Sequence, residues 1–285
     1  MSPEPGSSPS LFHAGAALAA TVCRIHRDGV RDRPDARVRA AVGGTYADLW
    51  ACTRLTRAGE VRESAATVAR YLVPRILLDA ADSLAAAWGD WFHEDSELAA
   101  DHRHHVGRLA DIAAAPGAGK RLRDVAARIP SLATGDDRLA HPLTAVPPTA
   151  LRAPLGRLVR ALEDERRAVL RAAASAAQTS LVDGRFAAAD DPGLWALADR
   201  YALLALAAEC LDGWRLPSTS QARPPGDDRA CLTGELARIA AGLGLAPGVT
   251  GQSWHGTVYA LATSGGAGTV AGAPLPRREF ARAGE

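Results

Sequence analysis

The stretch AATVARYLVPRILLDAADSLAAAWGDWFHED, residues 65–95, decides the fold class. It reads as one long helix, and we place the helical pattern at 63–92 with Ser64 as a plausible N-cap. Pro74 lies inside this pattern, where a proline removes one backbone hydrogen bond and kinks the helix. A Gly-Asp pair at 89–90 then closes it, because glycine commonly follows the end of a helix.

Helical patterns continue on both sides of this stretch, and the sequence contains no convincing strand and no repeat of 20–50 residues. Ala, Leu and Arg dominate the composition, whereas Phe, Tyr and Ile are few, and this mixture favours helices over sheets. The sequence therefore predicts an all-α protein. The other helices are expected at 11–27, 37–58, 97–114, 118–129, 149–178, 193–215, 229–243 and 251–263.

The chain divides into two helical regions, a first at 11–131 and a smaller second at 146–264. Between them, the Pro-rich stretch 130–150 has few periodic positions and is interpreted as a linker. The ends are expected to be a disordered tail at 1–10 and a flexible tail at 265–285. The long helix of the second region carries an apolar stripe of Leu151, Leu155, Leu158, Val159, Leu162, Val169 and Leu170.

Charge and composition exclude several classes of protein. The net charge of +1 provides no global attraction to nucleic acid or to an anionic membrane, so neither is expected as a partner. The apolar runs are shorter than the roughly 18 residues of a spanning helix, and the first ten residues lack the basic start of a signal peptide. The cysteines show no CxxC spacing and predict reduced, buried thiols in a cytoplasmic protein. They are Cys23, Cys52, Cys210 and Cys231.

Two motifs invite sharper interpretations. PGAGK at 116–120 lacks the first glycine and the Ser or Thr of a phosphate-binding loop, and no strand precedes it, so a turn between helices is expected. FHEDSELAADHRHH at 92–105 gathers possible metal ligands, but its spacing matches no known zinc motif, and a solvated loop is the simpler interpretation. We predict no metal site there. The possible ligands are His93, Glu94, His102, His104 and His105.

The segment RIHRDGVRDRPDAR at 24–37 is basic and ends a predicted helix. It is either a solvated turn or an anion site at a helix end, where several donors converge. Trp88 and Trp91 flank Gly89, where the end of a helix can pass close to a planar ligand. No Ser-His-Asp, Cys-His or close carboxylate pair stands out by local spacing.

The stretch ATVARYLVPRILLDAADSLAAAWGDWF resembles the helix of acyl-CoA dehydrogenases that ends in their flavin-contacting, Gly-rich turn. It is most similar to divergent members from actinomycete natural-product clusters, whose corresponding helix also contains YLVP. The segments 37–55 and 10–30 are similar to the family's second and first bundle helices. ALADRYALLALAAECLDGWR at 196–215 resembles the C-terminal extension of the same divergent members.

The resemblance implies a C-terminal four-helix bundle of the acyl-CoA dehydrogenase type at 11–131, followed by a helical extension. The family's N-terminal helical domain and middle β-domain are absent from this chain. The implied function is that of one subunit of a split or heteromeric FAD-dependent dehydrogenase that oxidises an acyl thioester, bound to coenzyme A or to a carrier protein, in secondary metabolism. A second acyl-CoA dehydrogenase-like chain would then share the FAD. The residues expected to contact the cofactor are Arg24, His26, Arg27, Trp88, Gly89 and Trp91.

Three departures from the family pattern argue against independent catalysis. Cys23 stands where the family's flavin-binding arginine is expected, although Arg24 can replace it by a shift of one residue. Asp90 follows Gly89, where a carboxylate would repel a pyrophosphate. Gly117 stands at the position of the usual catalytic glutamate, and 11–22 contains no acid that could act as the base. We therefore assign no catalytic residue to this chain.

Two other functions remain open from the sequence. The first is a non-catalytic helical scaffold or carrier-protein-binding partner that descends from the same domain and needs no flavin. The second is a self-contained helical protein that binds a small molecule between its helices, which only the Trp88 and Trp91 pair supports. A co-purifying flavoprotein chain would exclude the second of these.

Overall fold

In the computed structural model, every regular element of the described residues is a helix, so the predicted all-α class is confirmed. None of these helices is both long enough and apolar enough to cross a membrane. Of the tails predicted at 1–10 and 265–285, residues 1–7 and 265–285 lie outside the described residues, whereas Pro9 and Ser10 already belong to the first helix. Leu151 of the predicted stripe also lies outside the described residues. The structure describes 8–27, 35–115, 117–135, 137–143, 155–183, 192–215, 227–245 and 254–264.

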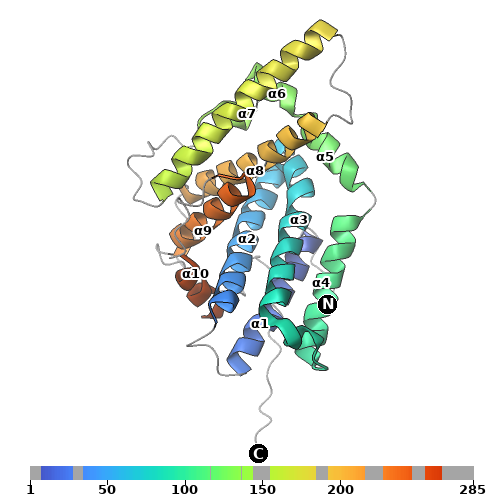
Figure 1. Ribbon diagram of the computed structural model, residues 1–285, viewed down its shortest axis with the longest axis vertical. Helices are drawn as coiled ribbons and strands as arrows, with labels where there is room; N and C mark the ends of the chain where they lie inside the picture. Colours follow the sequence, from blue (N-terminus) through green and yellow to red (C-terminus); the bar gives the residue numbers. More distant parts are fainter. Residues whose placement is uncertain are drawn as a thin grey trace, which may run out of the picture.

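Four long helices form the N-terminal half: α1 (Pro9–Arg27), α2 (Ala36–Val61), α3 (Glu63–Trp88) and α4 (Glu97–Ala114). α1 packs against the other three, and α3 packs against α2 and α4 as well (Figure 1). Helices that bury one apolar stripe need such neighbours to remove it from water. The more specific assignment to an acyl-CoA dehydrogenase-type bundle stays a prediction.

The bounds of α3 differ slightly from the prediction. The helix begins at Glu63, so Ser64 is not its N-cap; Arg62 occupies that position with an extended backbone and without a side-chain cap. Pro74 lies inside the helix and is buried. Gly89 ends it with a φ of +52°, a left-handed conformation that L side chains rarely adopt. A short 3-10 turn, η2 (Gly89–His93), follows and turns the chain toward α4.

The C-terminal half covers one end and one side of these helices. α7 (Leu155–Asp183) crosses the upper end in Figure 1, and α8 (Pro192–Arg215) lies between it and α2. α9 (Asp227–Gly242) and α10 (Trp254–Thr263) pack along α2. The smaller elements are α5 (Ala118–Ala126), α6 (Ile129–Thr134) and η3 (Arg138–Ala140).

The predicted linker at 130–150 is packed in its described part. Leu139 and Leu143 are almost fully buried. The Tyr201 hydroxyl donates a hydrogen bond of 2.9 Å to Asp137, and Arg138 binds both carboxylate oxygens of Asp212 at 2.9 Å. These contacts fasten the segment to α8. The remainder, 144–150, lies outside the described residues.

A single cluster of buried apolar residues joins the two predicted regions, with contributions from helices on both sides of η3. The division into regions at 11–131 and 146–264 stays a prediction.

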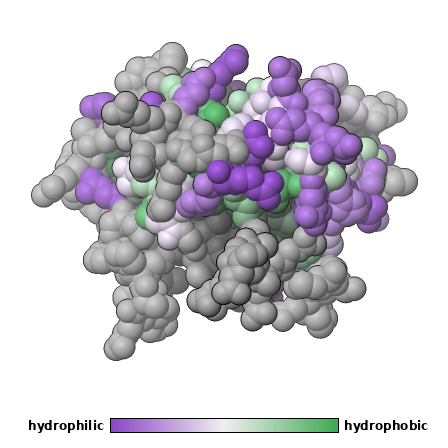
Figure 2. Space-filling model, turned by 90° about the horizontal axis from the view of Figure 1, so that it is seen from below, coloured by the Kyte–Doolittle hydropathy of each residue, from purple (hydrophilic) through white to green (hydrophobic). Residues whose placement is uncertain are grey.

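All four cysteines are described and none forms a disulfide, as predicted, but Cys23 is only half-buried, unlike Cys52, Cys210 and Cys231. Figure 2 shows the lower end of the molecule, where hydrophilic residues dominate the coloured surface and apolar residues form small patches between them.

Candidate functional site

Four of the six residues expected to contact a flavin lie together at one corner of the molecule: Arg24, Trp88, Gly89 and Trp91. The corner forms where the last turn of α1 meets η2 and the first turns of α4. Gly89 makes it possible, because its positive φ ends α3 and lets the two tryptophans approach each other across the turn.

Aromatic and ionic contacts link the members of this corner. The Arg24 guanidinium lies 5.8 Å from the ring centroid of Trp91, within the range of a cation–π interaction. Trp88 meets Trp91 edge to face, with centroids 5.5 Å apart. Arg24 Nη1 also lies 3.4 Å from Glu94 Oε2, so a carboxylate already neutralises the charge of this arginine.

His102 from α4 completes the corner, and its imidazole is fully buried. Its ring centroid lies 5.6 Å from that of Trp91, and Nδ1 lies 3.1 Å from the carbonyl oxygen of Ala17. Burial lowers the pKa of His102, which favours the neutral ring. Because a carbonyl only accepts hydrogen bonds, Nδ1 carries the proton and Nε2 presents a lone pair.

The corner contains polar ring atoms that are buried without a partner. They are Nε1 of Trp88, Nε1 of Trp91 and Nε2 of His102, two donors and one acceptor in the tautomer above. A buried polar atom without a hydrogen bond costs about 1–3 kcal/mol. A bound water or a ligand that offers both acceptors and a donor would remove this cost.

The residues present fit one edge of a flavin better than its phosphates. The pyrimidine edge of an isoalloxazine offers carbonyl acceptors beside an N–H donor, the kinds of group that the ring atoms of Trp88, Trp91 and His102 lack, although Trp91 and His102 are buried. A Cβ added to Gly89 would meet nothing within 4 Å, because this residue is exposed to solvent. Asp90, however, is exposed next to it, and its carboxylate would repel a pyrophosphate.

The other two predicted residues lie apart from the tryptophans. His26 Nε2 lies 3.1 Å from the carbonyl oxygen of Thr263, so this ring is engaged by the end of α10. Arg27 is exposed at the end of α1, near Cys23. Burial raises the pKa of the Cys23 thiol, and the charge of Arg27 only partly opposes this. The structure therefore does not bring the six residues into one site.

No described feature supplies a base where the family pattern expects one. Gly117 precedes α5 with a φ of +106° and offers no side chain.

Two histidines form a pair: His13 of α1 and His105 of α4 face each other with their Nδ1 atoms 2.9 Å apart. Within the described residues, no three His, Cys, Asp or Glu side chains are grouped so as to hold a metal ion.

The chain was compared with models of known protein families, with curated protein sequences and with solved structures, and none of these comparisons found a match. The resemblance to acyl-CoA dehydrogenases therefore stays an expectation from sequence. What the structure contributes is the corner itself, in which His102 joins Arg24, Trp88 and Trp91.

Proposed function

We propose that this chain is a helical subunit of a heteromeric, acyl-CoA dehydrogenase-like flavoenzyme of the cytoplasm. A second, related chain would hold most of the FAD, and this chain would contact the isoalloxazine edge. The substrate class is an acyl thioester on coenzyme A or on a carrier protein, in secondary metabolism. When bound, FAD supplies the hydride acceptor for oxidation of the thioester between its α and β carbons.

The single observation that supports this proposal most is the set of unpartnered ring atoms at the corner of Trp88, Trp91 and His102. Trp88 is half-buried and Gly89 is exposed, so a ligand held by a partner chain would meet them first. Trp91 and His102 are buried, so contact with them requires an outward movement of η2. Such a movement would break the hydrogen bonds that Arg103 donates to the carbonyl oxygens of Phe92 and Glu94.

In this proposal, the chain positions the cofactor but abstracts no proton. Glu94, the carboxylate paired with Arg24, is engaged by that guanidinium, and Asp90 faces solvent. The general base must act together with the hydride acceptor, so it would have to come from the partner chain. Trp88 and Trp91 would exclude water beside the flavin and fix the plane of its ring system.

A non-catalytic scaffold derived from the same domain is the second candidate. The observation that favours it is the Arg24–Glu94 ion pair, because a neutralised arginine attracts an anionic cofactor less strongly. The exposed carboxylate of Asp90 acts in the same direction. Such a scaffold would bind a related chain or a carrier protein and would leave the flavin content of the complex unchanged when the corner is altered.

Flavin content of the purified complex separates the two candidates. The tagged chain is isolated from its own host, and bound flavin is measured by its absorbance per mole of complex. Trp88→Ala is expected to lower this ratio severalfold, whereas Trp195→Ala, a matched tryptophan exposed on α8, should not change it. If both variants retain the flavin of the unaltered chain, the corner does not contact the cofactor.

A further inference from the structure

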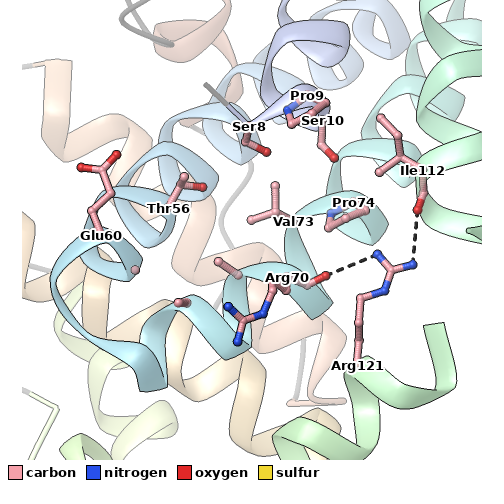
Figure 3. Close-up of a pocket in the computed structure, with 13 residues that line it drawn as sticks. Ser8, Pro9, Ser10, Thr56, Glu60, Arg70, Val73, Pro74, Ile112 and Arg121 are labelled. Carbon is pink, nitrogen blue, oxygen red and sulfur yellow. Dashed lines mark hydrogen bonds between the residues drawn. The ribbon is translucent and has the colours of Figure 1, made fainter. Parts of the chain in front are cut away.

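A groove lies at the opposite end of α3 from the tryptophan corner. It has a volume of about 500 Å³ and is bounded by the start of α1, the ends of α2 and α4, the first half of α3, and α5 (Figure 3). Pockets that bind small organic ligands typically span about 300–1,000 Å³. Pro74 and Trp88 are 14 residues apart along α3, which places the groove about 21 Å from the corner at 1.5 Å per residue.

The part of the groove lined by α3 and α4 is apolar apart from Arg70, and we call this part the floor. Ala66, Ala69, Val73 and Pro74 contribute one wall from α3, and Ile112 contributes the other from α4. The small residues belong to a close helix contact, since a Cβ added to Gly59 of α2 would lie 2.9 Å from the Cα of Ala66. An occupant of this floor must therefore be apolar and narrow.

Pro74 explains why a cation stands at the mouth of the groove. A proline has no N–H, so the carbonyl four residues earlier, that of Arg70, loses its helical donor. Arg121 of α5 turns toward this carbonyl, with Nη1 3.5 Å from it, and Nη2 lies 3.3 Å from the carbonyl oxygen of Ile112 at the end of α4 (Figure 3). The backbone thus fixes the guanidinium in place.

The guanidinium of Arg121 is paired with no carboxylate among the described residues. All of its described hydrogen bonds go to backbone carbonyls, and it forms no ion pair within the described part of the chain. Arg70, the other arginine of the groove, is paired with Glu63 at 2.7 Å. Glu60 lies on the opposite rim, so the groove has a negative side and a positive side (Figure 3).

We propose that this groove binds an amphipathic carboxylate of the fatty-acid type, with its head at Arg121 and its tail along Ala69 and Val73. A guanidinium binds a carboxylate through charge-assisted hydrogen bonds, and the apolar floor gains from contact with a hydrocarbon chain. Glu60 on the far rim repels the head and thereby sets its direction. The proposal uses none of the residues of the flavin corner, so either can fail without the other.

Binding of decanoate and decanol to the full chain tests the proposal by isothermal titration calorimetry. The unaltered chain is expected to bind decanoate about tenfold more tightly than decanol, because only the carboxylate engages Arg121. Ala69→Phe fills the floor and is expected to weaken binding of both probes at least tenfold. Ala100→Phe, which places the same ring on the exposed face of α4, is the control and should bind both as before.

Arg121→Gln separates the head from the tail. This variant is expected to bind decanol normally and to lose the preference for decanoate, with helical content checked by circular dichroism because Arg121 also holds the end of α4. The proposal is overturned if decanoate does not bind, if decanol binds the unaltered chain equally well, or if Ala69→Phe and Ala100→Phe bind decanoate alike.

Discussion

Replacing Arg238 with methionine should lower the free energy of unfolding more than removing any exposed ion pair does. Arg238 of α9 holds Asp48 of α2 through two hydrogen bonds, Nε to Oδ1 and Nη2 to Oδ2, each 2.7 Å long. Asp48 is 1% exposed, and Glu235, one turn before Arg238, is equally buried. The variant therefore leaves two buried carboxyl groups without their cation.

Removal of one partner from a buried ion pair typically costs about 3–5 kcal/mol. The Arg238 side chain is 37% exposed, so water reaches one side of it and the lower end of that range, about 3 kcal/mol, is expected. At roughly 2–4 °C for each kcal/mol, the midpoint of thermal unfolding should fall by about 6–12 °C. Urea unfolding followed by circular dichroism measures the loss in free energy.

The pH dependence of this loss provides the sharper test. Burial raises the pKa of Asp48 and raises that of Glu235 further, and Arg238 opposes the effect on both carboxyl groups. A carboxyl whose pKa is raised on folding favours the folded state less as the pH rises above its unfolded pKa. The cost of Arg238→Met should therefore be larger at pH 8 than at pH 5.

Glu235→Gln is the matched variant, since it keeps the size of the side chain and removes the titration. It should equal or exceed the stability of the unaltered chain at pH 8, with the difference shrinking toward pH 5. A loss below about 1 kcal/mol for Arg238→Met, or a loss that is the same at both pH values, would refute the assignment of a buried, charge-balanced pair.

Three further changes test other contacts by the same unfolding measurement. Leu139→Ala should cost about 2–5 kcal/mol if the predicted linker is core, and a change within 0.5 kcal/mol would show that it is not. Burial and His13 lower the pKa of His105 to about 4, so its protonation costs stability as the pH falls from 6.5 to 4. His105→Gln should therefore reduce the loss of stability over this range, and an unchanged pH profile would contradict this. Tyr71→Phe removes the 2.7 Å hydrogen bond to Asp199 and should cost about 1 kcal/mol, whereas a neutral effect would mean that water replaces it.

The positions of the helices could be predicted because the signals for them are local. Apolar periodicity marked α7, whose predicted stripe is buried at Leu155, Leu158, Val159, Leu162 and Val169. Ser96 caps α4 as its place before the predicted helix at 97–114 suggests, with its side chain accepting from the backbone N–H of Ala99. Gly89 ends α3 for the same local reason.

Contacts between distant parts of the chain could not be predicted in this way. Asp48 and Arg238 are 190 residues apart, and no spacing rule connects them. The segment 130–143 was predicted to be a linker because its prolines interrupt the helical pattern of apolar residues, yet Leu139 and Leu143 are buried in the core. Prolines stop a helix without preventing tertiary packing.

The flavin corner shows the same division. Arg24 and His26 were assigned to one site because the resemblance to the family's flavin-binding turn covers both, but residues two positions apart on a helix point about 200° apart. His26 consequently turns to α10 while Arg24 reaches Trp91. His102 was considered only as a metal ligand, and only the fold of α4 against η2 brings it to the tryptophans.

Native mass spectrometry of the tagged chain, purified from its own host, tests the proposed function most directly. We expect a complex with a second chain of acyl-CoA dehydrogenase type and additional mass equal to that of FAD. A monomer or homodimer that carries neither a second chain nor flavin would contradict the proposal.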